Sequence, residues 1–289
     1  MQSKKELSAS AQLRRVRITR GIIMIFLCIL SIIPFYLMIV NATRTTTEVQ
    51  SGVSFLFGTN LLENYANFQK SQAGLGITIL KAMLNSVIVT VPYTLLSVYV
   101  SSLTAYGIHT YDFKGKKFLW TFILGVMMVP NQVFAIGYYS FMLKIGLDDT
   151  FFSLIIPALT TPTVVFFMRE YLKGALSIAL VEAARIDGAK EFGIFNTIVI
   201  PLMKPAIATQ AIFQFVASWN NLFLPQLLIT STEKKTLTMF VSMLTGESFR
   251  TDYGVVFLGL TITIFPMLVA YFLLSKFIVE GVSLGGVKE

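Results

Sequence analysis

The sequence predicts an all-α, polytopic membrane protein with six transmembrane helices and with both termini in the cytoplasm. Three observations support this fold class. Of the 289 residues, 55% are hydrophobic and only 13% are charged, whereas soluble domains average about 25% charged residues. Charge-free apolar stretches recur along the chain, and Lys and Arg gather in alternate connections between them. So large an apolar excess cannot be buried in a water-soluble core.

Each apolar stretch is long enough to be a transmembrane helix, which needs about 20 residues to cross about 30 Å of hydrocarbon. Only helices satisfy every backbone hydrogen bond within lipid at these lengths. The stretches are 21–43, 82–108, 118–143, 151–168, 205–232 and 253–275, and the fourth is the shortest. Each contains proline, which predicts kinks that neighbouring helices accommodate.

The first stretch follows a basic segment and could be a cleaved signal peptide. Such a peptide has an apolar region of about 7–15 residues that ends at a small-residue cleavage site. The stretch 21–43 is longer and carries no Ala-x-Ala site. We therefore expect a retained first span, with residues 21–289 forming one membrane domain.

Basic residues predict the orientation. They gather in the N-terminal tail (1–20), after the second stretch, in the segment 169–204 and in the C-terminal tail (276–289). Because cytoplasmic segments carry the excess of Lys and Arg, we expect all of these to lie inside. The connections 44–81 and 231–252 then lie outside.

The sequence also excludes several classes of function. No Asp, Glu, Lys or Arg lies within the six stretches, although ion-coupled carriers usually keep an ionisable group at membrane depth. There is no phosphate-binding loop of the form Gly-x4-Gly-Lys-Ser/Thr. A single histidine, His109, and a single cysteine, Cys28, leave no multi-histidine metal site and no disulfide framework. We expect no catalytic residue, no metal site and, with the +8 net charge spread over loops and tails, no nucleic-acid partner.

The internal segment 169–204 carries the most specific motif. Glu-Ala-Ala is followed by three residues and Gly, and after nine more residues by an apolar triplet and Pro; these residues are Glu182, Ala183, Ala184, Gly188 and Ile198-Val199-Ile200-Pro201. Alanine favours helix and lets another surface approach closely, and Gly188 is placed to end or bend that helix. The alternative is an ordinary amphipathic helix that rests on lipid headgroups.

This spacing resembles the signature of the membrane subunits of binding-protein-dependent ATP-binding-cassette (ABC) importers, with Ile200 in place of the usual Leu. The run Ile186-Asp187-Gly188-Ala189 resembles the carbohydrate branch of that family. The similarity extends over most of the chain and is closest to the shorter permease of maltose-type importers. Supporting stretches are Glu63-Asn64-Tyr65, Asn85-Ser86, Ala105-Tyr106-Gly107, Met128-Val129-Pro130, Gly146-Leu147-Asp148-Asp149-Thr150 and Trp219-Asn220.

The resemblance implies a type I importer permease fold in a bacterial cytoplasmic membrane. It implies four kinds of partner: a second, homologous permease that completes the pore, two ATPase subunits, an extracytoplasmic solute-binding protein and membrane lipid. The cargo would be a carbohydrate, and an oligosaccharide is expected. ATP and Mg would be used by the ATPases, so this chain would bind no cofactor and would not be an enzyme.

The resemblance also implies roles for particular residues. The loop helix would dock in a cleft of the ATPase through Glu182, Ala183, Ala184, Asp187 and Gly188. The tail would reach between the ATPase subunits through Gly285, Gly286 and Lys288, although the final Glu289 stands where many relatives have Gly. The alternative for the tail is a frayed terminus.

Polar and aromatic residues in the fifth stretch are candidates for a substrate pathway: Gln214, Trp219, Asn220 and Asn221. Amides at membrane depth tend to face a bundle interior or a water-filled path. The alternative is hydrogen bonding and packing between helices. Three other functions stay open: an ABC permease for a sugar phosphate or polyol, an ATP-independent carrier or channel, and a membrane scaffold.

Overall fold

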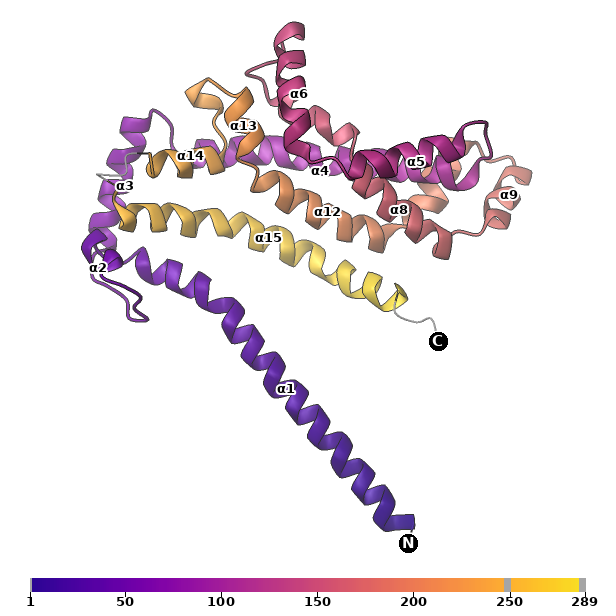
Figure 1. Ribbon diagram of the computed structural model, residues 1–289, viewed down its shortest axis with the longest axis horizontal. Helices are drawn as coiled ribbons and strands as arrows, with labels where there is room; N and C mark the ends of the chain where they lie inside the picture. Colours follow the sequence, from indigo (N-terminus) through magenta and orange to yellow (C-terminus); the bar gives the residue numbers. More distant parts are fainter. Residues whose placement is uncertain (1, 247–250, 286–289) are drawn as a thin grey trace. The chain divides into compact units, whose positions relative to one another are not determined.

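The computed structural model describes residues 2–246 and 251–285, and every regular element within these ranges is helical. The chain divides into two compact units. The first consists of Met1–Ser71 and Leu244–Ile262, and the second of Gln72–Met243 and Thr263–Glu289. Figure 1 labels most of the helices of both units.

The first unit contains α1 (Gln2–Asn41), α2 (Thr46–Gln50), most of α3 (Leu61–Leu75) and the beginning of α15 (Tyr253–Gly285). The long helix α1 includes the predicted first span and also most of the predicted N-terminal tail. From residue 22 to residue 35 its large apolar side chains are exposed, apart from the half-buried Ile33. A helix with such a surface needs lipid or another subunit around it.

A buried amide joins three elements of the first unit. The Asn64 side chain of α3 is 1% exposed, and its Nδ2 donates to the carbonyls of Ala42 and Arg44, each at 2.9 Å. At the beginning of α15, a Cβ on Gly254 would stand 2.4 Å from that nitrogen. Only glycine therefore fits at this position.

The second unit is built around α4 (Ile79–Thr110), which packs against α8 (Pro162–Ala175) and α12 (Lys204–Trp219). Shorter helices complete the unit: α5 (Lys116–Met127), α6 (Asn131–Ile145), α7 (Phe151–Ile155), α9 (Ile178–Ile186), α10 (Glu191–Ile194), α11 (Ile200–Leu202), α13 (Phe223–Leu228) and all but the last residue of α14 (Leu237–Leu244). Single turns of 3-10 helix lie at Ile156–Leu159 and Thr232–Lys234, and a π-helical turn lies at Phe195–Val199.

Small hydroxyl residues line the buried face of α4. Ser97 and Ser101 are each within hydrogen-bonding distance of the Thr161 hydroxyl, at 2.9 and 2.8 Å. The Ser218 hydroxyl of α12 donates to Thr90 at 3.3 Å. Small side chains let helix backbones approach closely, and their hydroxyls hydrogen-bond across helices. The hydroxyls of α4 thus find hydrogen-bond partners at neighbouring helices, and no charged side chain is needed there.

The spans differ in continuity. Four stretches are long and apolar enough to cross a membrane: Val16–Asn41, Ile79–Thr110, Phe151–Ala175 and Tyr253–Phe272. Two pairs of helices pass the same test only when combined, Lys116–Met127 with Gln132–Ile145, bent by 102°, and Glu191–Leu202 with Lys204–Trp219, bent by 80°. The described residues thus hold four candidate spans, or up to six if each bent pair crosses as one.

Three predicted spans are not single continuous helices. The third breaks at Pro130, which has no N–H to donate and adopts an extended conformation (ψ 133°) before α6. The fourth divides into α7, a 3-10 turn and α8, although these together form one candidate span. The fifth was predicted over 205–232, but the bent pair lies earlier in the chain and ends at Trp219, and α13 follows after a turn. In that turn the Asn221 side chain accepts a hydrogen bond from the Leu224 amide at 3.2 Å, which satisfies one of the first N–H groups of the new helix.

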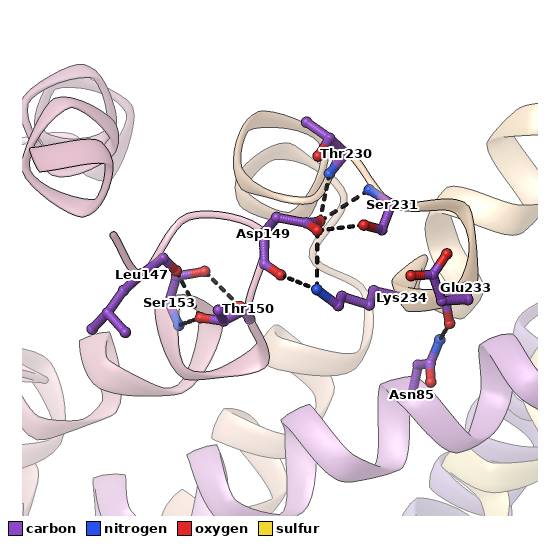
Figure 2. A network of polar contacts seen from close by, with 9 residues as sticks. All are labelled: Asn85, Leu147, Asp149, Thr150, Ser153, Thr230, Ser231, Glu233 and Lys234. Carbon is purple, nitrogen blue, oxygen red and sulfur yellow. Dashed lines mark hydrogen bonds and ion pairs between the residues drawn. The ribbon is translucent and has the colours of Figure 1, made fainter. Parts of the chain in front are cut away.

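A polar network joins the turn before α7 to the segment that follows α13 (Figure 2). Asp149 has a positive φ of 50°, and its carboxylate accepts from the Thr230 and Ser231 amides, both at 2.9 Å. It also accepts from the Ser231 hydroxyl and from Lys234 Nζ, the latter at 3.0 Å. Burial alone would raise the pKa of Asp149, but the hydrogen bonds from Ser231, Lys234 and Thr230 outweigh it and hold that pKa well below its usual range.

Candidate coupling site

The Glu-Ala-Ala motif forms α9, which has a buried face and an exposed face. Val181 is fully buried and Ala184 is 9% exposed, and both belong to a hydrophobic cluster with residues of α8 and α10. Glu182, Ala183 and Asp187 are exposed. The core of the unit therefore fixes the helix and leaves its acidic face accessible to a partner. Of the two alanines, only Ala183 lies on the accessible face.

Gly188 ends this helix, which confirms the sequence prediction. Its φ is +82°, in the left-handed region that glycine enters without strain. The Gly188 amide donates to the Arg185 carbonyl and the Ala189 amide to the Ala184 carbonyl, both at 3.0 Å. These two bonds form a Schellman motif, which satisfies the last carbonyls of the helix. The chain then turns sharply toward α10.

An acid-base cluster behind α9 ties it to two other elements. Arg185 Nε donates to Glu191 Oε1 at 2.5 Å, and the hydroxyls of Tyr106 and Tyr111 both donate to Glu191 Oε2, the first at 3.0 Å. The Arg185 guanidinium also lies 5.4 Å from the centre of the Tyr111 ring. Since both tyrosines lie at the end of α4, Glu191 connects α9 and α10 to that helix. We name these four residues the Glu191 cluster.

Sequence reasoning missed this cluster. Arg185 and Glu191 were visible only as charges in the internal segment, and Tyr106 only as part of a stretch that supports the family resemblance. Burial and the hydrogen bond to Glu191 together raise the pKa of Tyr111, so this hydroxyl stays a proton donor at physiological pH. The sequence carried little sign of this cluster, because Tyr111 and Glu191, which share a hydrogen bond, are 80 positions apart in the chain.

Aromatic packing continues the connection into the membrane. The Phe195 ring is 1% exposed, and its centre lies 5.7 Å from that of Tyr106 and 5.6 Å from that of Tyr99. Tyr99 also donates a hydrogen bond to Asn196 at 3.2 Å. These close-packed contacts connect the segment after α9 to α4.

The candidate pathway residues lie around the end of α12. Trp219 is 2% exposed and stacks on Phe215 with ring centres 5.6 Å apart. Asn220 is exposed, with Nδ2 3.6 Å from Met267 Sδ. Gln214 is half-buried. The fourth candidate, Asn221, is half-buried and accepts the hydrogen bond from the Leu224 amide at the beginning of α13. These four residues therefore differ in exposure, and Asn220 is the most accessible.

The remaining expectations concern the tail and metals. Gly285 is the last residue of α15, and Gly286 and Lys288 lie outside the described residues. Within the described part of the chain, no group of three or more His, Cys, Asp or Glu side chains is placed to hold a metal ion.

Comparisons with known proteins identify the class. Residues 97–283 match the family described as "Binding-protein-dependent transport system inner membrane component". The chain belongs to this family. It is therefore a multi-pass permease subunit of an ABC transporter in the inner membrane, and it is not catalytic. The class implies that an ATPase and a solute-binding protein act with it.

Individual relatives cover almost the whole chain. The arabinooligosaccharides transport system permease protein AraQ of Halalkalibacterium halodurans is 32% identical over 266 residues, 91% of this chain and 93% of that protein. The lactose transport system permease protein LacG of Rhizobium radiobacter is 32% identical over 259 residues, 90% of this chain and 92% of that protein. A solved bacterial ABC transporter involved in alginate import shares the fold, with a TM-score of 0.73 at 21% identity, over 91% of this chain and 96% of that one.

Proposed function

We propose that this chain forms half of a heterodimeric pore that imports an oligosaccharide. The other half is a second, homologous permease, and two ATPase subunits drive the cycle. The names of the relatives support the cargo, since AraQ and LacG serve arabinooligosaccharides and lactose. The described residues hold four to six candidate spans, which is enough for only half of a pore, and this supports the need for a second permease.

The single observation that carries the proposal is the accessible acidic face of α9. Glu182, Ala183, Asp187 and Gly188 are all exposed, on a helix whose other face is buried in the core. In our proposal this face docks in a cleft of the ATPase, and Glu182 meets basic side chains there. An exposed acid on a rigid helix suits such a contact, because few side chains need to be ordered when it forms.

ATP binding by the partner then changes the conformation of the pore. A ligand shifts an equilibrium only by its different affinity for the two states. Closure of the ATPase dimer moves α9, and the Glu191 cluster transmits the movement to α4. The ATP and Mg stay in the partner, so this chain needs only mechanical contact.

Other parts of the chain receive roles in the same proposal. The surfaces that contact the solute-binding protein lie within the outer connections 44–81 and 231–252, and the tail with Gly285, Gly286 and Lys288 reaches between the ATPases. Asn220 is the most accessible candidate for substrate contact. Ala184 contributes to docking only indirectly, since it is buried beneath the exposed face of α9.

Co-purification tests the proposal. The tagged chain is extracted in mild detergent, as wild type, as Glu182→Lys and as Glu63→Lys, a matched charge reversal at an exposed residue of α3. We expect an ATP-hydrolysing subunit and a second permease with the wild type and with Glu63→Lys, and loss of the ATPase with Glu182→Lys. A chain that comes alone and moves solute without ATP contradicts the proposal and favours the carrier alternative.

The cargo needs a separate test. No basic residue lies in the six predicted stretches, which disfavours a sugar phosphate because a phosphate needs a cation to replace its water. Competition between unlabelled oligosaccharides, polyols and sugar phosphates in an uptake assay decides between the alternatives. Inhibition by a polyol or sugar phosphate alone contradicts the oligosaccharide.

A further inference from the structure

An apolar loop follows the first span in the first unit. Between Glu48 and Glu63 the sequence carries no charge. Val53, Leu56 and Phe57 are 77%, 79% and 58% exposed. Isolated apolar residues are common on protein surfaces, but several on one short loop mark an interaction site.

The loop is fastened at both ends. The Arg44 side chain donates to the Gly52 carbonyl at 3.1 Å. At the other end, the Gly58 and Asn60 amides donate to the side-chain and backbone oxygens of Thr43, at 2.8 and 2.9 Å. A Cβ on Gly58 would stand 2.4 Å from the Thr43 carbonyl oxygen, so the backbones are in close contact. The apolar residues are therefore held in place by the chain itself.

A tyrosine of the first span fixes the depth of the loop. Tyr36 donates to the Phe55 carbonyl at 2.6 Å, and its ring centre lies 6.5 Å from that of Phe55 and 5.8 Å from that of Phe57. It precedes Asn41, the end of α1, by about 7.5 Å along the helix axis at 1.5 Å per residue. The loop thus turns back beside the last turns of the span (Figure 1).

We propose that this loop is a lipid anchor, in which Val53, Phe55, Leu56 and Phe57 insert at the boundary between headgroups and acyl chains of the outer leaflet. The loop lies beside the last turns of a candidate membrane span, next to Tyr36, at the depth where aromatic residues concentrate. Burial of these side chains in lipid is favourable because it removes apolar area from water. The fastening at both ends means that little conformational entropy is lost on insertion. This proposal rests on the membrane location and orientation of the chain, not on its cargo.

Tryptophan fluorescence tests the anchor. The chain is reconstituted with its partners in vesicles of phosphatidylethanolamine and phosphatidylglycerol whose acyl chains carry bromine either near the glycerol or near the chain end. Leu56→Trp and Val53→Trp report from the loop, and Lys70→Trp reports from an exposed position of α3. The wild-type emission of Trp120 and Trp219 is subtracted.

We expect blue-shifted emission from both loop variants, quenched most strongly by bromine near the glycerol and hardly by aqueous iodide. Lys70→Trp should show the reverse. Iodide quenching of the loop variants equal to that of Lys70→Trp would mean that the loop lies in water. Protection from both quenchers would mean that a protein, such as the second permease, covers it. Either result overturns the proposal, and co-purification of the partners shows that each variant has assembled.

Discussion

The Glu191 carboxylate is the point at which α9, α10 and the end of α4 meet. Its two oxygens receive hydrogen bonds from Arg185, Tyr106 and Tyr111. The Arg185 and Glu191 side chains are 34% and 45% exposed, so solvent screens their attraction and the pair adds little stability. Its value lies in geometry, because it joins α9 and α10 to the end of α4.

Loss of this acceptor should uncouple the transporter. In Glu191→Ala the ATPase still co-purifies, because the exposed face of α9 is unchanged, but solute taken up per ATP hydrolysed falls several-fold. The double variant Arg185→Glu with Glu191→Arg restores the pair in reverse and should recover part of the loss. An unchanged ratio of uptake to hydrolysis in Glu191→Ala would show that the cluster has no part in coupling.

A glycine at the end of α9 provides a second test at this scale. Gly188→Ala places a Cβ at φ +82°, which destabilises the turn by about 1–2 kcal/mol. We expect a lower Tm of the purified assembly and weaker retention of the ATPase. Gly193→Ala is the matched control, since Gly193 lies within α10 and shows no positive φ. Equal effects of the two substitutions would contradict the role given to the turn.

At the scale of whole elements, the segment 230–234 depends on one acidic side chain. Asp149 accepts hydrogen bonds from Thr230, Ser231 and Lys234 (Figure 2). Hydrogen bonds to a charged group contribute about 1.5–3 kcal/mol. Without the carboxylate, this segment would be held mainly by Asn85, which donates to the Glu233 and Lys235 carbonyls at 2.8 and 2.9 Å.

The stability that Asp149 contributes should depend on pH. Because its pKa is lowered in the folded state, the contribution is complete above the unfolded pKa of about 3.9 and is lost as the pH falls through the lower, folded value. Asp149→Asn, which tolerates the positive φ, should lower the Tm at neutral pH. The difference from wild type should shrink below about pH 4. Asp148→Asn, outside this network, is the control, and a pH-independent difference would contradict the assignment.

The sequence predicted where most membrane helices lie but not where three of them are interrupted. Absence of charge identifies the stretches 118–143 and 205–232 as apolar, and hydropathy carries no information about backbone direction. The breaks at Pro130 and after Trp219 depend on local backbone geometry. Prolines in all six stretches predicted kinks, but they did not distinguish a kink from a bend of 102°.

The same limit applies to the candidate site. Its exposed face was predictable because the Glu-Ala-Ala spacing lies within a few turns of one helix. The buried Ala184 and the Glu191 cluster were not, since they depend on contacts with distant parts of the chain. The candidate pathway residues were grouped by polarity, whereas the structure buries Trp219 and leaves Asn220 exposed.

At the scale of the whole molecule, the chain is a membrane permease that must take its energy from a partner. It carries no phosphate-binding loop and no charge in its predicted spans. It presents an acidic helix face, and behind that face a polar and aromatic connection leads to α4. Continuous contacts therefore lead from the exposed face of α9, through the Glu191 cluster, to the candidate span α4.

ATP-dependent uptake of a labelled arabino-oligosaccharide into vesicles tests the central claim most directly. The vesicles carry the assembled importer, with its binding protein outside and ATP inside. We predict uptake that requires internal ATP and disappears in Glu182→Lys. Uptake without ATP, or unchanged uptake in Glu182→Lys, would contradict the account.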